Sequence, residues 1–388
     1  MQIAIVGCGY VADFYLTTLP NHPELELLGI TDRDEDRAAR FAAHHSVRRF
    51  RDLGELLADD RVQLVVNLTN PRSHYEVSKV ALEAGKHVYT EKPLATDWSQ
   101  AVALVEEAEH RGLQIASAPC TMLGESAQTL WKAVREGAIG KIHLAYAELD
   151  DGMVHRENYR TWISGSGNPW PFKDEFEIGC TLEHAGYYVS WLAALFGPAE
   201  SVTAFASCQI PEKSPDVPLE PSDTPDFAVG CIRFASGVVA RLTCSIIAPH
   251  DHSLRLLGDG GVLSVKECWD FGSPVLIKRW TRWSFRAERY PTAARLLGLG
   301  DRRYPHVRPA KFQYKTPGAN PIDFARGVAE LAAAIREGRP CRLSPRYSLH
   351  LNEIVLTLQD PAGMRSPRRL TSTFEPIEPM PWASGGRI

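Results

Sequence analysis

Lys92 has a side chain type that is suited to proton transfer and charge stabilisation. It stands between Glu91 and Pro93 in the sequence. A lysine ammonium group beside a hydroxyl or carbonyl oxygen stabilises developing negative charge there and can relay a proton. A solvated lysine before a turn is the plainer interpretation, and residue type alone favours it. A catalytic role for Lys92 therefore needs support from its surroundings.

A second group of candidates follows later, in a stretch of helical composition. Residues of an α-helix are about 100° apart, so Glu183 and Tyr187 are neighbours on one face, together with Ser190. His184 lies at the border of that face, and an apolar arc that includes Tyr188 lies opposite. The helical pattern favours Tyr187 for a cleft, whereas the ordinary pKa of an imidazole makes His184 the better general base. Both stay candidates, and a solvated face or a structural histidine remains the alternative.

A glycine loop near the N-terminus predicts a site for a dinucleotide. Gly7-x-Gly9-x-x-Ala12 follows an apolar strand and opens a helix. Gly7 permits the tight turn, Gly9 lets the backbone approach a pyrophosphate, and Ala12 keeps the helix close to the sheet. Tyr10 and Val11 complete the loop, and the N–H groups of the helix N-terminus face the phosphates.

Asp32 ends the second strand, at the distance where an acidic residue binds the adenosine ribose hydroxyls. This carboxylate favours NAD as the cofactor. Arg33 follows it directly, and a guanidinium there can bind a 2′-phosphate, so NADP is the alternative. We expect NAD, with NADP possible.

Strand-like and helix-like segments alternate up to about residue 120, which predicts a parallel sheet with helices on both faces. The expected strands are 3–6, 25–31, 62–68 and 87–90, and the expected helices are 11–19, 34–41, 73–84 and 98–111. A helix at 126–135 and strand-like runs at 142–149, 201–206, 227–234, 238–246 and 253–257 predict a largely antiparallel sheet, followed by helices at 322–336 and 347–358. We place the domains at residues 1–120 and 121–388, and residues 269–318 allow no assignment.

Composition narrows the class of protein. A chain of 388 residues suits two domains, and a net charge of −4 gives no reason to expect nucleic acid or a membrane as a partner. Eight scattered cysteines without a C-x-x-C pair predict reduced thiols and a cytoplasmic protein. His250 and His252 have the spacing of strand neighbours, so we expect no metal site.

The segments after the third strand resemble the Gfo/Idh/MocA oxidoreductases, the family of glucose–fructose oxidoreductase and inositol dehydrogenase. The resemblance is carried by residues 65–71, Ser73-His74, the run ALEAGKHV at 81–88, and Glu91-Lys92-Pro93-Leu94. It is strong over residues 1 to about 150, weaker through 160–260, and returns at 322–358.

The resemblance implies a Rossmann domain joined to an α/β domain with a large, open, mainly antiparallel sheet. The outer face of that sheet would form the subunit interface of a homodimer or homotetramer. The nicotinamide would lie at the domain junction, within reach of Lys92, and Asn70 and Pro71 would line its pocket. The resemblance also assigns Thr69, His74 and Glu91 to cofactor binding. A cationic nicotinamide would lower the pKa of Lys92, and the Lys92–Pro93 peptide is expected to be cis.

The second half departs from the family pattern. Relatives often carry an Asp and, four residues later, a His, whereas Glu183 and Tyr187 take these positions here and Ser190 replaces a later Asp. A tyrosine at that place occurs in glucose–fructose oxidoreductase, so redox chemistry is compatible with the change. Substrate binding is assigned to Lys92, Glu183 and Tyr187 together with residues of a loop before them. These loop residues are Arg160, Trp162 and Lys173. The alternative is that this loop is merely exposed to solvent and binds no substrate.

The expected activity is reversible hydride transfer between nicotinamide and a secondary alcohol or ketone of a sugar, a cyclitol or a sugar-like metabolite. Lys92 would polarise the reacting oxygen, and Tyr187 or His184 would relay the proton. Two alternatives remain open. One is a glycosidase that uses NAD for transient oxidation, and the other is a non-catalytic regulator that binds NAD and a ligand.

Overall fold

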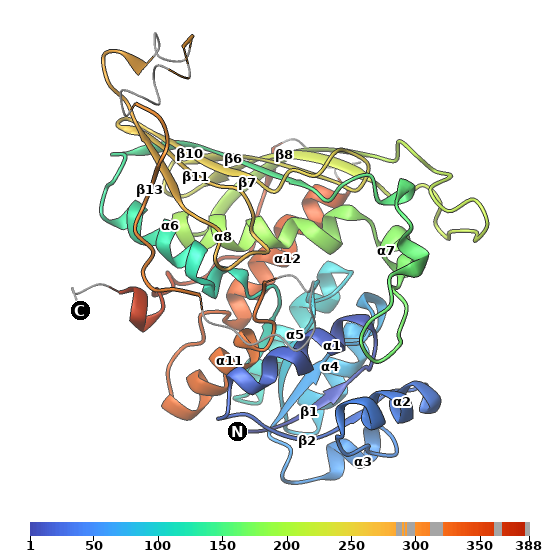
Figure 1. The fold of residues 1–388 in the computed structure, drawn as a ribbon. Helices are drawn as coiled ribbons and strands as arrows, with labels where there is room; N and C mark the ends of the chain where they lie inside the picture. Colours follow the sequence, from blue (N-terminus) through green and yellow to red (C-terminus); the bar gives the residue numbers. More distant parts are fainter. Residues whose placement is uncertain (285–288, 291, 293–298, 311–320, 361–366, 385–388) are drawn as a thin grey trace.

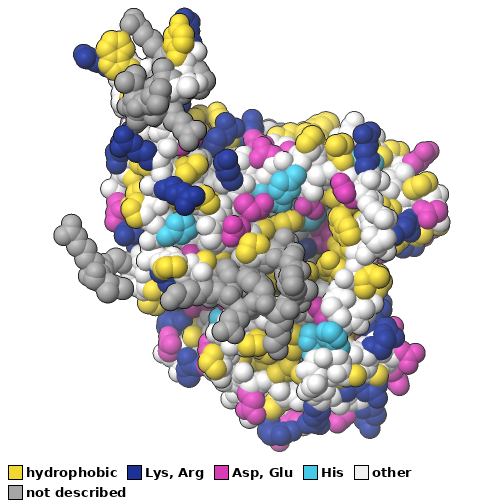
Figure 2. Space-filling model, in the orientation of Figure 1, with side chains coloured by type: hydrophobic (Ala, Val, Ile, Leu, Met, Phe, Trp, Pro, Cys, Tyr) yellow, Lys and Arg dark blue, Asp and Glu magenta, His cyan; other side chains and the backbone are white. Residues whose placement is uncertain are grey.

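The protein is described by a computed structural model that covers residues 1–284, 289–290, 292, 299–310, 321–360 and 367–384. Two sheets lie at opposite ends of the molecule, with helices packed between them (Figure 1). Acidic and basic side chains are interspersed on the face that Figure 2 shows, with Lys and Arg gathered near β12 and β13. None of the described helices is both long and apolar enough to cross a bilayer.

The N-terminal sheet has five parallel strands in the order β2-β1-β3-β4-β5. They are β1 (Gln2–Val6), β2 (Glu26–Thr31), β3 (Leu64–Asn67), β4 (His87–Thr90) and β5 (Ile115–Ser117). The helices are α1 (Tyr10–Thr18), α2 (Glu35–His45), α3 (Leu53–Ala58), α4 (His74–Glu83) and α5 (Trp98–His110). The expected parallel sheet is confirmed. Sequence patterns missed α3 and β5, which are too short to show a period.

The C-terminal sheet has nine strands in the order β13-β12-β11-β10-β6-β9-β8-β7-β14. Its strands are β6 (Ile142–Asp150), β7 (Ala199–Ser207), β8 (Phe227–Phe234), β9 (Val239–Ser245), β10 (Leu254–Gly258), β11 (Gly261–Val265), β12 (Leu276–Arg279), β13 (Arg302–Arg303) and β14 (Arg368–Arg369). The central pair β6–β9 is parallel and the other pairs are antiparallel. The expectation of a mainly antiparallel sheet is confirmed. β12 and β13 fall within 269–318, and parts of that segment lie outside the described residues.

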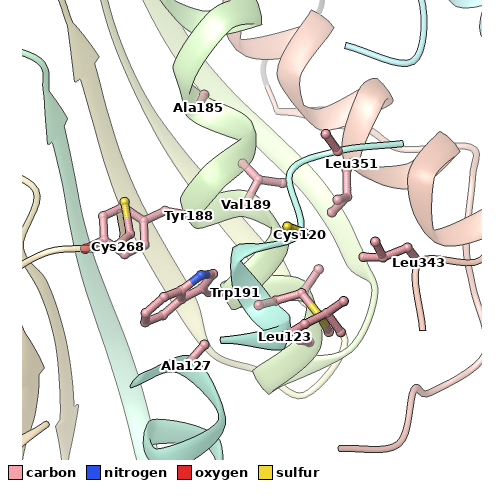
Figure 3. Packing of buried hydrophobic residues seen from close by; sticks show 14 of the residues in the cluster. Cys120, Leu123, Ala127, Ala185, Tyr188, Val189, Trp191, Cys268, Leu343 and Leu351 are labelled. Carbon is pink, nitrogen blue, oxygen red and sulfur yellow. The ribbon is translucent and has the colours of Figure 1, made fainter. Parts of the chain in front are cut away.

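Helices between the sheets join the two halves into one packed body. They are α6 (Glu125–Arg135), α7 (Phe172–Ile178), α8 (Gly186–Phe196), α11 (Arg326–Glu337) and α12 (Pro345–Gln359). α12 contacts α5 on one side and α8 on the other. Tyr188, Val189 and Trp191 of α8 project into a buried cluster with Cys120 and Leu351 (Figure 3). The chemistry-bearing residues near α8 therefore stand on a helix that is fixed by burial.

Candidate active site

One large cavity runs from the glycine loop to the start of α8 and has a volume of about 720 Å³. Such a volume is within the range of small-molecule and cofactor sites. Its lining joins the carboxyl ends of the parallel strands to residues of the C-terminal half, among them Lys92, Glu183, His184 and Tyr187. The structure thus brings together the two groups of candidates that the sequence separates.

The glycine loop is shaped as a phosphate cradle. Gly7 has φ +96°, and a Cβ there would lie 2.6 Å from the carbonyl carbon of Leu68. A Cβ on Gly9 would meet no atom within 4 Å, so open space lies above the backbone at the position where a pyrophosphate needs it. Tyr10 and Val11 line the cavity. Ala12 is fully buried and packs in the core, as its expected role requires.

Asp32 lines the same end of the cavity and also holds the loop. Its Oδ2 accepts a hydrogen bond from the Cys8 N–H at 2.8 Å, and its Oδ1 accepts one from the Asp34 N–H at 2.9 Å. Arg37 reaches within 3.6 Å of Asp32 Oδ2. Arg33 lines the cavity, as do Arg37 and Arg51, which sequence reasoning missed. The residues fit an adenosine dinucleotide, with a carboxylate for ribose hydroxyls and cations for phosphate.

At the opposite end, Thr69, Asn70, Pro71 and Glu91 line the cavity. His74 does not reach it. The side chain of His74 is fully buried, and its ring nitrogens contact the carbonyl oxygens of Thr69 at 3.0 Å and Pro93 at 2.7 Å. Burial lowers the pKa of His74, while the hydrogen bonds to the two carbonyl oxygens oppose this shift. Its role in this structure is to hold the two loops that flank the site.

Glu91 and the Lys92–Pro93 peptide position Lys92. Glu91 Oε1 accepts a hydrogen bond from the Tyr15 hydroxyl at 2.7 Å, and Glu91 Oε2 accepts one from the Lys92 N–H at 3.0 Å. The Lys92–Pro93 peptide is cis, as the resemblance implied. Lys92 is therefore held at the cavity by buried hydrogen bonds on the residue before it.

Lys92 Nζ donates a hydrogen bond to Glu183 Oε2, forming an ion pair across the cavity. Burial alone would lower the pKa of Lys92, but the carboxylates of Glu183 and Glu175 hold this pKa well above its usual range. Burial, and next the neighbouring Glu183 carboxylate, raise the pKa of Glu175. Lowering of the Lys92 pKa by a bound nicotinamide stays a prediction.

Tyr187 and His184 both line the cavity, and a π-helical turn at Thr181–Ala185 precedes α8. Turns of this type are frequent at functional sites. Burial raises the pKa of Tyr187, so its phenol is a neutral hydrogen-bond donor. Burial, with the nearby Lys92 charge, holds the pKa of His184 well below its usual range. Trp269 packs against both rings, with centroids 5.3 Å from Tyr187 and 5.8 Å from His184.

The structure does not bring Arg160, Trp162 and Lys173 to the cavity lining. Arg160 forms an ion pair with Asp216 and lies over the Phe172 ring, 4.6 Å from its centroid. The Trp162 ring packs on the Trp170 ring at 5.1 Å. Lys173 Nζ lies 3.6 Å from Glu177 Oε1. Each side chain is engaged by a partner that sequence patterns do not reveal.

The same segment, which runs from this loop into α7, contributes other residues instead. Asn168, Trp170 and Glu175 line the cavity. Asn168 Nδ2 donates to the Cys8 carbonyl at 2.9 Å, and Ser166 Oγ donates to Asp13 Oδ2 at 2.6 Å. These bonds tie the loop to the glycine loop and α1. Trp170 is one of two aromatic residues in a Pro-rich segment, and this pattern could have indicated it. Glu175 and Trp269 belong to no distinctive motif.

Two family profiles match the chain over most of its length. Residues 1–118 match the Gfo/Idh/MocA profile, described as an oxidoreductase family with an NAD-binding Rossmann fold. Residues 127–264 match the C-terminal domain of the same family.

Individual proteins are similar over a comparable span. An uncharacterized oxidoreductase of Synechocystis sp. is 26% identical over 278 residues, which cover 68% of this chain and 71% of that protein. Trans-1,2-dihydrobenzene-1,2-diol dehydrogenase of Bos taurus is 25% identical over 274 residues, which cover 69% and 75%.

Solved structures share the fold. UDP-N-acetylglucosamine 3-dehydrogenase from Acidithiobacillus ferrooxidans has a TM-score of 0.67 at 19% identity, covering 92% of this chain and 96% of that chain. A 3-ketoreductase from Actinomadura kijaniata, in complex with TDP-benzene and NADP, has a TM-score of 0.67 at 22% identity, covering 92% and 95%.

Proposed function

The chain belongs to the Gfo/Idh/MocA family of NAD(P)-dependent oxidoreductases, and from this premise we propose that it transfers a hydride between nicotinamide and a secondary alcohol or ketone of a sugar, cyclitol or sugar-like metabolite. The observation that carries the proposal is the Lys92–Glu183 ion pair in the cavity that begins at the glycine loop. It sets a proton donor and a proton acceptor beside the end of the cavity opposite the adenosine site.

The residues divide between holding the cofactor and moving the proton. Gly7, Gly9 and Asp32 would hold the adenosine and pyrophosphate, and Asn70 and Pro71 would flank the nicotinamide. When bound, the nicotinamide accepts or donates the hydride.

Lys92 and Tyr187 donate hydrogen bonds to the reacting oxygen. In the direction of oxidation, Lys92 takes the hydroxyl proton as it passes its own proton to Glu183, so the substrate loses one hydride and one proton and becomes a ketone. In reduction the same path runs backwards, and the proton leaves Glu183 for the new hydroxyl group. Tyr187 stays protonated throughout, because burial raises the pKa of its phenol.

The lining of the cavity supports a polyhydroxylated substrate. Asp174, Glu175 and Glu183 offer carboxyl groups for hydroxyls, and Trp170 and Trp269 offer flat apolar surfaces. Among the similar proteins, one is named as a dehydrogenase of a diol and another as a dehydrogenase of a sugar nucleotide. These features together favour a diol or sugar over a simple alcohol.

For the cofactor we propose a preference for NAD. Asp32 lies at the lining, where a 2′-phosphate would meet its negative charge. Arg33, Arg37 and Arg51 offset part of that repulsion, so NADP binds more weakly but is still accepted.

A panel of sugars, cyclitols and nucleotide sugars, followed at the NADH absorbance with NAD and with NADP, tests the proposal. On the substrate found, Lys92→Met should lower kcat by about 100-fold or more. Lys79→Met removes an exposed lysine of α4 and should leave the rate unchanged. Release of free sugar without net NADH would replace the proposal by a glycosidase, and absence of turnover across the panel would favour a ligand-binding regulator.

A further inference from the structure

A cluster of histidine and carboxylate side chains lies at the end of β6, beside the active-site cavity. Asp151 directly follows β6, and His250 and His252 stand on the connection between β9 and β10. β6 pairs with both of these strands, and Asp150 and Asp251 exchange backbone hydrogen bonds of 3.0 and 2.9 Å. This pairing brings one ligand atom of each of Asp151, His250 and His252 within 4.8 Å of the others.

His252 is the unexplained member of this cluster. Its side chain is fully buried, and its Nδ1 lies 2.8 Å from Glu267 Oε1. A neutral imidazole that donates from Nδ1 leaves a lone pair on Nε2. That Nε2 has no hydrogen-bond partner among the described residues, and it lies 3.8 Å from Asp151 Oδ1. Burying an unpaired polar atom is costly, so the arrangement needs a further group between these two atoms.

The separation of 3.8 Å is too long for a hydrogen bond and suits a bridging cation. Two atoms bound to one zinc ion at about 2.0–2.2 Å in tetrahedral geometry are about 3.4 Å apart. We propose that Asp151, His250 and His252 bind a divalent transition-metal ion of the zinc or ferrous class. Two imidazoles and one carboxylate form a donor set that such ions prefer, and they leave coordination positions open.

Glu267 completes the site as the group that orients the ligands. Its Oε2 lies 3.2 Å from His250 Nε2, while its Oε1 contacts His252. One carboxylate thus holds both rings, as the outer partners of metal-binding histidines commonly do. The sequence expectation of no metal site rested on the spacing of His250 and His252, and it did not include Asp151, which is distant in the chain.

The ion would lie next to the proposed active site without being required by the proposed function. Asp151 Oδ2 is 3.7 Å from His184 Nε2, and Asp151 lines a small cavity together with Glu175 and Glu183. A bound ion would hold the Asp151 side chain in place, and with it the part of the cavity wall that lies next to His184. Metal content can be measured without any substrate, so its test is independent of hydride transfer.

The test uses the full chain without a histidine tag, stripped with EDTA and dialysed against zinc, with bound zinc measured by mass spectrometry. We expect one zinc per chain. His250→Ala and Asp151→Asn change partly exposed ligands, and each should weaken zinc binding by about 100-fold or more. Glu267→Gln should weaken it by about 10–100-fold.

His143→Ala is the matched control, because His143 is similarly exposed and pairs with Asp259 away from the cluster. It should bind zinc as the wild type does, and circular dichroism should show all four variants folded. Cobalt(II) loading separates this site from the eight cysteines, since thiolate ligands add an intense near-ultraviolet band that should be absent. Failure to bind zinc, unchanged affinity in both ligand variants, or a thiolate spectrum would each overturn the proposal.

Discussion

Lys92 Nζ and Glu183 Oε2 are hydrogen-bonded across the boundary between the two halves of the protein. Lys92 follows β4 of the parallel sheet, and Glu183 belongs to the π-helical turn before α8. Each residue lacks its partner if the halves separate, so the site exists only when the two halves pack together through α12, which contacts both α5 and α8. The buried contacts of α8 and α12 are therefore part of the catalytic arrangement.

Replacing the carboxylate of this pair should move the pH dependence of the reaction. Glu183 holds the pKa of Lys92 up against the effect of burial. In Glu183→Gln that pKa falls, so ketone reduction, which needs Lys92 protonated, should decline at a lower pH than in the wild type. We also expect kcat to drop by about 100-fold. Glu83→Gln, in the exposed Lys79–Glu83 pair, should match the wild type in pH–rate profiles, and parallel profiles for Glu183→Gln and the wild type would refute the role of Glu183.

The roles of Tyr187 and His184 can be distinguished with two variants. One removes the phenol oxygen of Tyr187, and the other removes the imidazole ring of His184. Burial keeps the Tyr187 phenol protonated, which suits a donor to the reacting oxygen. Tyr187→Phe should lower kcat by about 10- to 100-fold with a smaller change in KM. His184→Asn should have the lesser effect on kcat, and Tyr75→Phe on α4 should have none. A larger loss in His184→Asn would assign the proton to the imidazole.

Local patterns were sufficient for the parts of the site that follow a strand directly. The glycine loop and Lys92 each come just after a short buried strand, so the parallel sheet places both at its carboxyl edge. The alternation of strands and helices places both segments at this edge, whereas the assignment of Lys92 to the site came from the family resemblance. Glu175 and Trp269 could not be found in this way, because long connections bring them to the cavity.

The helical wheel of α8 shows where a local pattern fails. It placed Ser190 on the same face as Glu183 and Tyr187, yet Ser190 is fully buried, and its carbonyl accepts a hydrogen bond from the Tyr347 hydroxyl of α12 at 2.5 Å. The wheel also assumed α-helical spacing where the chain forms a π turn, so His184 reaches the cavity lining together with Tyr187. A second helix packed on the polar face cannot be read from one helix alone.

Asp32 should decide which dinucleotide binds better. Asp32→Ser removes the charge that opposes a 2′-phosphate and leaves Arg33 and Arg37 in place. We expect the ratio of Kd for NADP to Kd for NAD to fall by about 10-fold or more. Both affinities also weaken somewhat, because Asp32 Oδ2 holds the Cys8 N–H. Titration by fluorescence measures both constants, and a ratio equal to that of the wild type would contradict the assignment of Asp32.

The two glycines of the loop should respond differently to the same methyl group. The methyl group that Gly9→Ala adds has no atom within 4 Å, so the free protein should keep its thermal stability. The same methyl group blocks close approach of the pyrophosphate. We expect its Kd for NAD to rise by about 10-fold or more. Gly7→Ala has a positive φ and a contact of 2.6 Å with Leu68, so it should lose about 1–3 kcal/mol of stability. Equal stability losses in thermal unfolding would contradict this division of roles.

His350 should make the fold sensitive to mild acid. Its ring is fully buried between α12 and the start of β7, where Nε2 accepts a hydrogen bond from the Ala199 N–H at 2.9 Å. Burial lowers its pKa from 6.5 to about 4. The unfolded chain therefore binds the proton first, so the stability contributed by neutral His350 is present above pH 6.5 and is lost as the pH falls toward 4. Between pH 7 and pH 5 this loss is about 2 kcal/mol. His350→Gln offers an amide oxygen to Ala199 but does not titrate, so urea unfolding of this variant should show a correspondingly smaller loss of stability over that range. An identical loss in both proteins would assign the acid sensitivity to other groups.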